Sequence, residues 1–175
     1  VLTKPTVHFT GPTTLCVGST TTLSPTSGGT WQSSNTAVAT VTNAGVVTSV
    51  AQGMAYFTFT LSGGCVSDPS PYLTVNGKPN ISVTGPLGIC TGAQTQLQPS
   101  TGGTWVSSKP SVATITNGGV VTGLTAGTVK FVFTESATGC VSDSSTAITI
   151  NPAPFISFPG NPNLCVGNAV NVFPS

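Results

Sequence analysis

The chain has 175 residues, of which only 4% are charged, and its formal net charge is +1 with no arginine. This composition excludes a basic nucleic-acid surface and polybasic attachment to a membrane, because both need clustered cationic side chains. The mean hydropathy is positive and β-branched residues are abundant, which excludes a disordered polar segment. The 31 threonines and 20 serines, together with Val and Gly, are typical of strands with one solvated face that are joined by tight turns.

Two similar repeats and the beginning of a third account for the whole sequence. We expect residues 1–5 to be the tail of a preceding repeat, 6–79 and 80–154 to be two full repeats, and 155–175 to start a truncated third. Such a regular period predicts one structural unit that is used serially. The short junctions contain proline and predict semi-rigid connections between neighbouring units. We therefore expect the chain to be a segment of a longer array.

Short strands follow one another along each repeat, and they are easiest to place in the second. The predicted strands are residues 81–85, 95–100, 103–108, 112–116, 120–124, 128–135 and 145–151. Alternation of apolar side chains is clearest at Val129, Phe131 and Phe133. Strands spaced about 8–12 residues apart, with turn residues between them, predict an all-β fold of the sandwich type. No apolar run approaches the roughly 18–20 residues that a membrane-spanning helix needs.

The motif W-x-S-S-x-x-x-V-A-T-[VI]-T-N-x-G-V-V-T occurs at residues 31–48 and 105–122, with a later glycine at 53 and 127. This pattern resembles the bacterial immunoglobulin-like domain group 2, which is found in the stalks of invasin- and intimin-type adhesins. The resemblance implies tandem immunoglobulin-like β-sandwich domains in a linear array. It places Trp31 and Trp105 between the two sheets, so we expect core residues rather than a glycan-binding surface.

Two departures from the common family pattern are a cysteine pair in each repeat and the scarcity of acidic residues. Both features also resemble the large repetitive adhesins that gliding or biofilm-forming bacteria secrete. Cysteines at fixed repeat positions further indicate an oxidising, extracytoplasmic compartment.

The five cysteines leave two pairings open. In the first, each repeat closes its own bridge, Cys16–Cys65 and Cys90–Cys140, and the partner of Cys165 lies in a further repeat. A loop of this kind contributes about 4 kcal/mol by chain entropy. In the second, Cys16 bonds to Cys140. Seven alternating strands put the first and last turns of one domain at opposite poles, roughly 20 Å or more apart, whereas a disulfide needs Cα atoms within about 7 Å. With one strand more or fewer, the two turns would lie at the same pole, and this objection to the pairing within a repeat would disappear.

Other polar residues form no recognisable catalytic, cofactor or metal site. Asp68 and Asp143 recur after the second cysteine, but one carboxylate per repeat is a poor calcium site, and turn hydrogen bonding is the expected role. His8 is the only histidine and has no acidic or cysteine cluster beside it in the sequence. Asn80 begins a glycosylation sequon, to which we give little weight in a bacterial-looking chain.

The function that these patterns favour is structural. We expect a stalk or fibre segment of a secreted bacterial cell-surface adhesin that projects a distal binding region, and not an enzyme. Its expected partners are neighbouring repeats of the same chain, with lateral self-association as a further option and with host or environmental glycans or proteins bound through other regions. The alternatives are a multivalent glycan- or protein-binding module, which sandwich loops often provide, and a self-assembling extracellular filament, since uncharged edges do little to oppose strand pairing.

Overall fold

The computed structural model describes residues 3–154, and every regular element in this range is a β-strand. The expected all-β class is therefore confirmed. The described chain divides into two compact units. The first contains the residues up to Asn80 together with Gly102–Thr104 and Phe133–Asp143, and the second contains the remainder. The expected third repeat at 155–175, with Cys165, lies outside the described residues.

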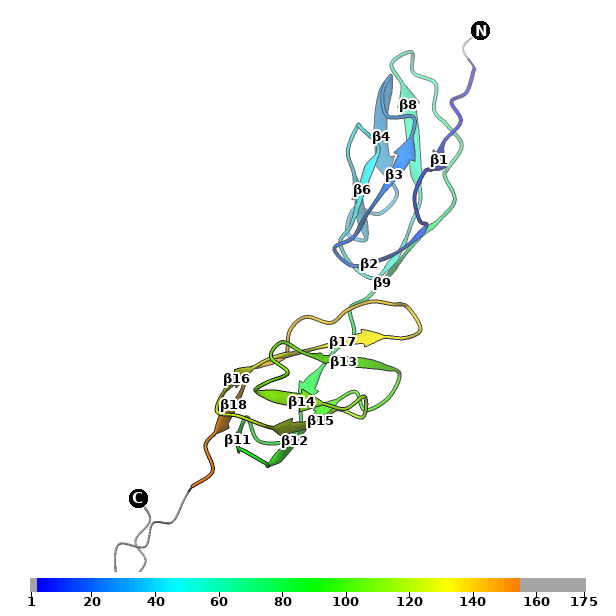
Figure 1. The fold of residues 1–175 in the computed structure, drawn as a ribbon. Helices are drawn as coiled ribbons and strands as arrows, with labels where there is room; N and C mark the ends of the chain where they lie inside the picture. Colours follow the sequence, from blue (N-terminus) through cyan, green and yellow to red (C-terminus); the bar gives the residue numbers. More distant parts are fainter. Residues whose placement is uncertain (1–2, 155–175) are drawn as a thin grey trace, which may run out of the picture. The chain divides into compact units, whose positions relative to one another are not determined.

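Nine short strands belong to the first repeat (Figure 1). They are β1 (His8–Phe9), β2 (Thr14–Cys16), β3 (Thr20–Ser24), β4 (Gly29–Ser33), β5 (Ala39–Val41), β6 (Val46–Ser49), β7 (Gly53–Ala55), β8 (Phe57–Leu61) and β9 (Leu73–Asn76). One sheet has the order β1-β3-β6-β5. The other layer is formed by the pair β4-β8 and the group β2-β9-β7.

Apolar side chains from both layers meet in one core. Leu23 of β3 and Val47 of β6 come from the first sheet, and Phe59 of β8 and Val75 of β9 come from the other layer. Each of these side chains is at most 1% exposed. Their neighbours along each strand are more exposed and, apart from Val46, polar, as the two-residue period of a half-buried strand requires. The first repeat is thus a β-sandwich with its own hydrophobic core.

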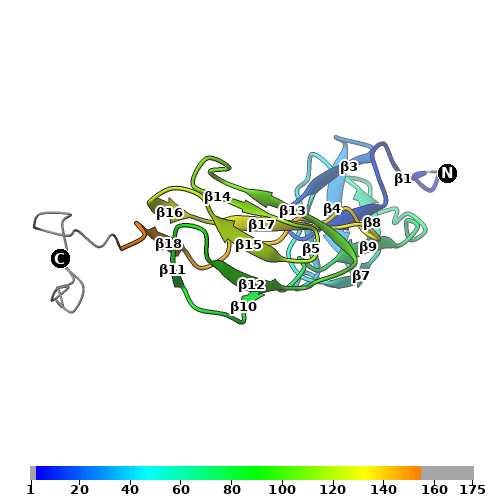
Figure 2. The ribbon, with the colours of Figure 1, turned by 60° about the horizontal axis from the view of Figure 1, so that its bottom comes forward.

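The second repeat has the same nine strands (Figure 2). They are β10 (Ser82–Val83), β11 (Gly88–Cys90), β12 (Gln94–Gln98), β13 (Gly103–Ser107), β14 (Ala113–Ile115), β15 (Val120–Gly123), β16 (Gly127–Val129), β17 (Phe131–Glu135) and β18 (Ile148–Asn151). The sheet orders β10-β12-β15-β14, β11-β18-β16 and β13-β17 repeat those of residues 8–76. The sequence period is therefore also a structural period.

Two features of the strands differ from the sequence-based expectation. The single long strand expected at 128–135 is interrupted at Lys130, because β16 pairs with β18 whereas β17 pairs with β13. The short strands β2 and β11 were not expected at all. Each is only three residues long and pairs in parallel with the last strand of its repeat. Gly-Pro dipeptides at 11–12 and 85–86 separate them from the preceding strand. These unexpected strands carry Cys16 and Cys90 at their ends.

Candidate functional site

The most distinctive chemical feature is a disulfide between Cys16 and Cys140, which are 124 residues apart in the sequence. Their Cα atoms are 5.5 Å apart, within the usual range for a disulfide. Both residues belong to the first compact unit, although Cys140 is part of the second repeat. We call Cys16 and Cys90 the first-turn cysteines, and Cys65 and Cys140 the last-loop cysteines.

Backbone hydrogen bonds hold Cys16 at the end of β2. Its register partner in the parallel strand β9 is Asn76. The N–H of Val17 donates to the carbonyl oxygen of Asn76 at 3.0 Å, and the N–H of Ser19 donates to that of Cys16 at 3.0 Å. The chain therefore turns immediately after the cysteine, which places the side chain at one end of the sandwich.

A compact loop fixes the other half of the bond. The N–H of Glu135 donates to the carbonyl oxygen of Cys140 at 2.9 Å, and the N–H of Gly139 donates to that of Glu135 at 2.8 Å. Inside the loop, the Thr138 hydroxyl donates to a Glu135 carboxylate oxygen at 2.6 Å and accepts from the N–H of Cys140 at 3.2 Å. Cys140 is fully buried. These hydrogen bonds fix the backbone on both sides of Cys140.

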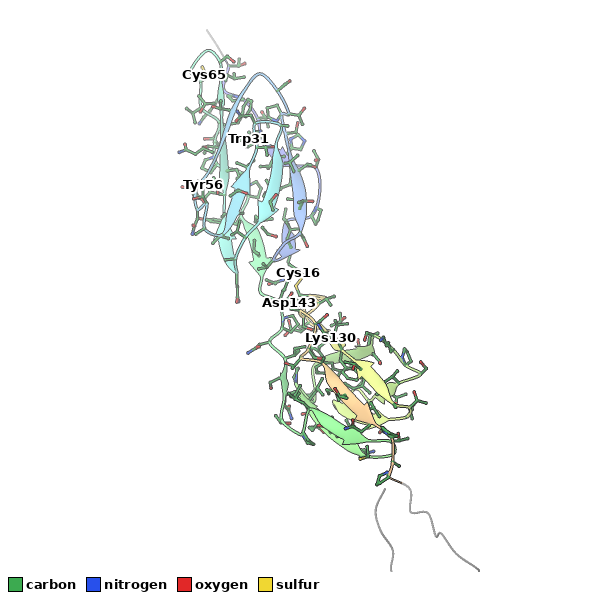
Figure 3. All side chains as sticks on the ribbon, turned by 90° about the vertical axis from the view of Figure 1, so that its left-hand side faces the viewer. Cys16, Trp31, Tyr56, Cys65, Lys130 and Asp143 are labelled. Atoms are coloured by element: carbon green, nitrogen blue, oxygen red, sulfur yellow. A yellow bond between two sulfur atoms is a disulfide. The ribbon has the colours of Figure 1, made fainter. Side chains whose placement is uncertain are left out.

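Of the two pairings that the sequence left open, the structure contains the one between repeats. The alternative Cys16–Cys65 and Cys90–Cys140 bridges are not formed. Figure 3 shows the reason within the first repeat, where Cys16 and Cys65 lie at opposite ends of the sandwich. The first turn and the last loop of one sandwich cannot meet, as the alternating direction of the strands indicated.

An ion pair accompanies each last loop. The Lys78 ammonium contacts the Asp143 carboxylate, and the Lys4 ammonium contacts that of Asp68. The sequence reasoning expected turn bonding by the aspartates and missed these partners. The Lys-Pro dipeptides that begin at Lys4 and Lys78 are 74 residues apart, and the two aspartates are 75 apart. This shared period was the signal in the sequence that could have indicated the ion pairs. All four side chains are substantially exposed, from 40% to 80%, so each pair contributes little to stability on its own.

The segment after each last-loop cysteine is not a regular strand, and a buried serine in it hydrogen-bonds to the backbone of the neighbouring strand. The Ser142 hydroxyl accepts a hydrogen bond from the N–H of Phe133 at 2.9 Å and donates to the carbonyl oxygen of Asp143 at 2.8 Å. In the first repeat, Ser67 accepts from the N–H of Phe59 at 3.0 Å. These hydroxyls satisfy backbone groups that would otherwise be buried without partners. They therefore hold the segment with the last-loop cysteine on the sheet without a regular ladder.

The two tryptophans lie in the sandwich interiors, at 7% and 6% exposure. The indole N–H of Trp31 donates to the carbonyl oxygen of Pro25 at 2.9 Å, and that of Trp105 donates to Pro99 at 3.0 Å. The Trp31 ring also packs on Phe59, with ring centroids 5.0 Å apart. Figure 3 shows Trp31 inside its sandwich rather than on a face. A buried indole with its N–H satisfied is a packing residue.

Three surface hollows of the described residues are either small or wide open to solvent. The hollows beside Lys4 and beside Lys78 have volumes of about 160 and 210 Å³, below the range usual for ligand pockets, whereas the hollow beside Pro86 and Gln94 reaches about 350 Å³ but is open rather than enclosed. Within residues 3–154, no three His, Cys, Asp or Glu side chains gather as metal ligands would. His8 lies alone on the short strand β1. The same range contains no helix that is long and apolar enough to span a bilayer.

No protein-family model matches this sequence, and no curated protein matches it either. Among solved structures, a C-terminal fragment of intimin in complex with the intimin-binding domain of its translocated receptor is similar over 89% of this chain. The identity is 17% and the TM-score is 0.50. The chain spans 66% of that fragment, which is less than two thirds of its length.

Invasin, described as a bacterial integrin-binding protein, is similar over 88% of this chain and 40% of its own, with 16% identity and a TM-score of 0.48. The surface-layer protein SbsC is similar over 79% of this chain and 25% of its own, with 18% identity and a TM-score of 0.30. The similarity to the intimin fragment concerns the fold, and it confirms the expected tandem immunoglobulin-like sandwiches.

Proposed function

We propose that this chain is a structural stalk segment of a secreted bacterial cell-surface adhesin, which projects a distal binding region. The observation that carries the proposal is the disulfide between Cys16 and Cys140. It ties the first turn of one repeat to the last loop of the next. A covalent bond of this kind is useful where successive domains must stay joined under load. The likeness in fold to the intimin fragment supports the same assignment.

The consequence of this bond for tension is direct. A chain that is pulled from its two ends transmits force to Cys16, across the sulfur atoms to Cys140, and onward. The residues between these cysteines, which include seven of the nine strands of the first repeat and eight of the nine strands of the second, are bypassed. Unfolding them under load would require the disulfide to break first. The repeats would thus keep the stalk at constant length while the distal region holds its ligand.

The proposal is tested by replacing the segment in the surface protein that carries it. Residues 6–154 are exchanged for two unrelated immunoglobulin-like sandwiches of equal length, and adhesion is measured together with the distance of the binding region from the cell. We expect adhesion to be retained, because a stalk acts through length and stiffness. Loss of adhesion at preserved length would show that these repeats themselves bind the ligand, and would overturn the proposal.

One observation favours a second candidate, the recognition of a glycan. Tyr56 and Tyr72 form an edge-to-face pair with ring centroids 5.6 Å apart, and Tyr72 is 57% exposed. Exposed aromatic rings on an uncharged, hydroxyl-rich surface are suited to stacking on sugar rings. The corresponding residues of the second repeat are Lys130 and Ala147, so any such site would occur once and not be repeated. Binding to a glycan array that is lost in Tyr72→Ala would favour this candidate.

A further inference from the structure

The first-turn cysteine of the second repeat, Cys90, has the same backbone environment as the bonded Cys16. Cys90 ends β11, which pairs in parallel with β18, and its register partner is Asn151. The N–H of Thr91 donates to the carbonyl oxygen of Asn151 at 2.9 Å, and the N–H of Ala93 donates to that of Cys90 at 2.9 Å. The two corresponding hydrogen bonds around Cys16 join equivalent atoms, and their donor–acceptor distances differ from these by 0.1 Å. Cys90 is therefore presented at the end of its sandwich as Cys16 is.

The state of the two residues differs. Cys16 is bonded to Cys140, whereas Cys90 is exposed and takes part in no disulfide in the structure. An isolated exposed cysteine would indicate nothing by itself. Here, however, the equivalent position of the neighbouring repeat shows which partner the turn accepts. That partner is a cysteine in a loop of the sequence Gly-Cys-Val-Ser-Asp, which occurs at 139–143 and at 64–68.

The loop that presents such a cysteine is itself a repeated structure. In the first repeat, the N–H of Leu61 donates to the carbonyl oxygen of Cys65 at 2.9 Å, as the N–H of Glu135 does to that of Cys140. The N–H of Ser67 also donates back to the carbonyl oxygen of Phe59 at 2.8 Å, and Ser142 makes the same bond to Phe133. The loop of the second repeat is one residue longer, but both loops hold their cysteine to the neighbouring strand by these same two backbone hydrogen bonds.

We propose that Cys90 is a second attachment site, which forms a disulfide with the last-loop cysteine of a further repeat of this kind. This inference rests on the proposed stalk function, in which repeats follow one another. The partner is an immunoglobulin-like repeat with the loop sequence Gly-Cys-Val-Ser-Asp. With both first-turn cysteines bonded, the closed loops overlap, since Cys90 lies between Cys16 and Cys140. Each repeat would then be covalently joined to its neighbours by two routes, the backbone and the sulfur atoms.

The ion pair of the first junction is not available at the second. Ala153 stands where the first repeat ends with Lys78, the residue that contacts Asp143. A last loop that docks at Cys90 therefore finds no cation at this position. Recognition there depends on the shape of the turn and on the disulfide.

The bond forms by oxidation of two thiols. The Cys90 thiol and the partner thiol lose two protons and two electrons as their sulfur atoms join. The electrons pass to the disulfide of a thiol–disulfide oxidoreductase, which is reduced to a dithiol, or in vitro to oxidised glutathione. Alternatively, the Cys90 thiolate attacks the partner cysteine's sulfur in its mixed disulfide with glutathione, the old S–S bond breaks, and glutathione leaves as a thiolate.

The test uses a tandem variant of the full chain, in which a second copy of residues 81–154 is inserted after Pro154. The inserted copy carries Leu87→Val and Val141→Ile as mass markers, at positions that are 47% and 46% exposed. The protein is oxidised with a glutathione redox buffer, and the remaining thiols are alkylated. Mass spectrometry of a non-reduced digest then identifies the cross-linked peptides. The unmarked Cys16–Cys140 pair in the same digest reports that the repeats have folded.

We expect the unmarked Cys90 peptide to be joined to the marked Cys140 peptide in most molecules. In the matched Cys90→Ser tandem variant, the marked Cys140 peptide is expected to be alkylated instead. Recovery of the unmarked Cys90 as an alkylated thiol, or joined to Cys165 or to any other cysteine, would overturn the inference. The segment-replacement experiment does not depend on thiols, so it can succeed while Cys90 fails to bond, which separates the two proposals.

Discussion

The two repeats build the same turn around their first-turn cysteines but support it with different side chains. In the first repeat, the Ser49 hydroxyl lies 2.7 Å from the carbonyl oxygen of Cys16 and 2.8 Å from that of Ser19. Its single hydrogen is shared between these two acceptors. The hydroxyl thus reinforces the turn that carries the disulfide.

Gly123 occupies the position of Ser49 in the second repeat, and the neighbouring Val75 is replaced by Ile150. A Cβ atom on Gly123 would lie only 2.9 Å from Cγ2 of Ile150, so the larger side chain takes the space that the serine leaves. The backbone hydrogen bonds are nevertheless shared. The comparison teaches that the backbone sets the turn, whereas the side chains around it vary as pairs that conserve volume.

The largest effect is expected at the tryptophans, which the two repeats use in the same way. Trp31→Ala and Trp105→Ala should each lower the free energy of unfolding of their own repeat by about 3–5 kcal/mol, the usual loss for a buried tryptophan. Denaturant unfolding followed by circular dichroism measures the loss. Each repeat has one tryptophan, so the fluorescence of the remaining indole follows the unchanged repeat. Clearly unequal losses would show that the two cores are not equivalent.

The first-turn cysteines should differ most in their response. Cys16→Ser removes a bond that closes a very long loop, and we expect a loss of about 2–4 kcal/mol relative to the oxidised protein. Cys90→Ser changes an exposed side chain, so a change within about 0.5 kcal/mol is expected. Thermal unfolding of the 175-residue chain without reductant compares the two variants. Equal losses would contradict the assignment of the disulfide to Cys16.

The paired exchange near Cys90 tests the volume argument. Gly123→Ser alone should destabilise the second repeat by about 1–2 kcal/mol, because its Cβ crowds Ile150. Adding Ile150→Val recreates the combination of the first repeat, and we expect it to recover most of the loss. The coupling is measured by a double-mutant cycle in urea. Additive effects would mean that the two positions do not share this space.

The ion pairs should matter least. Lys78→Ala and Lys4→Ala each remove one exposed pair, and the expected loss is below about 1 kcal/mol and smaller still at high salt. Unfolding midpoints at low and high ionic strength provide the measurement, with Lys109→Ala as a control on an exposed lysine without an ion pair among the described residues. A larger loss for Lys78 that persists in high salt would assign the pair a structural role.

Much of the fold was predictable from the sequence because each strand and turn pattern occurs in both repeats. Alternation at Val129, Phe131 and Phe133 predicts the strand region of β16 and β17, and the turn at 117–119 predicts the boundary between β14 and β15. The interruption at Lys130 was not predictable, since a strand that changes sheets keeps its alternation while its hydrogen-bonding partner changes. Strand β11 was missed because three residues after a Gly-Pro dipeptide give too little pattern.

The sequence limited the cysteine pairing to two alternatives, within repeats or between repeats, but could not distinguish them. The geometric argument depended on the number of strands, and the parallel pairing that holds Cys16 beside Asn76 is long-range information that no local pattern carries. The structural role of the Ser67 and Ser142 hydroxyls could not be predicted either. The chain has 20 serines, and the sequence does not distinguish a buried serine from a solvent-exposed one.

The most direct test of the proposed stalk is to stretch single molecules in the presence and absence of a reductant. The Cys16–Cys140 bond closes a loop with a sequence separation of 124 residues and prevents it from extending under force. Fully extended, this loop corresponds to roughly 400 Å of chain at about 3.3–3.6 Å per residue. We expect the reductant to release this length both in the unchanged chain and in Cys65→Ser/Cys90→Ser. The release should be absent in Cys16→Ser/Cys140→Ser. Loss of the release in Cys65→Ser/Cys90→Ser would place the bonds within repeats and contradict the load-bearing bond between them.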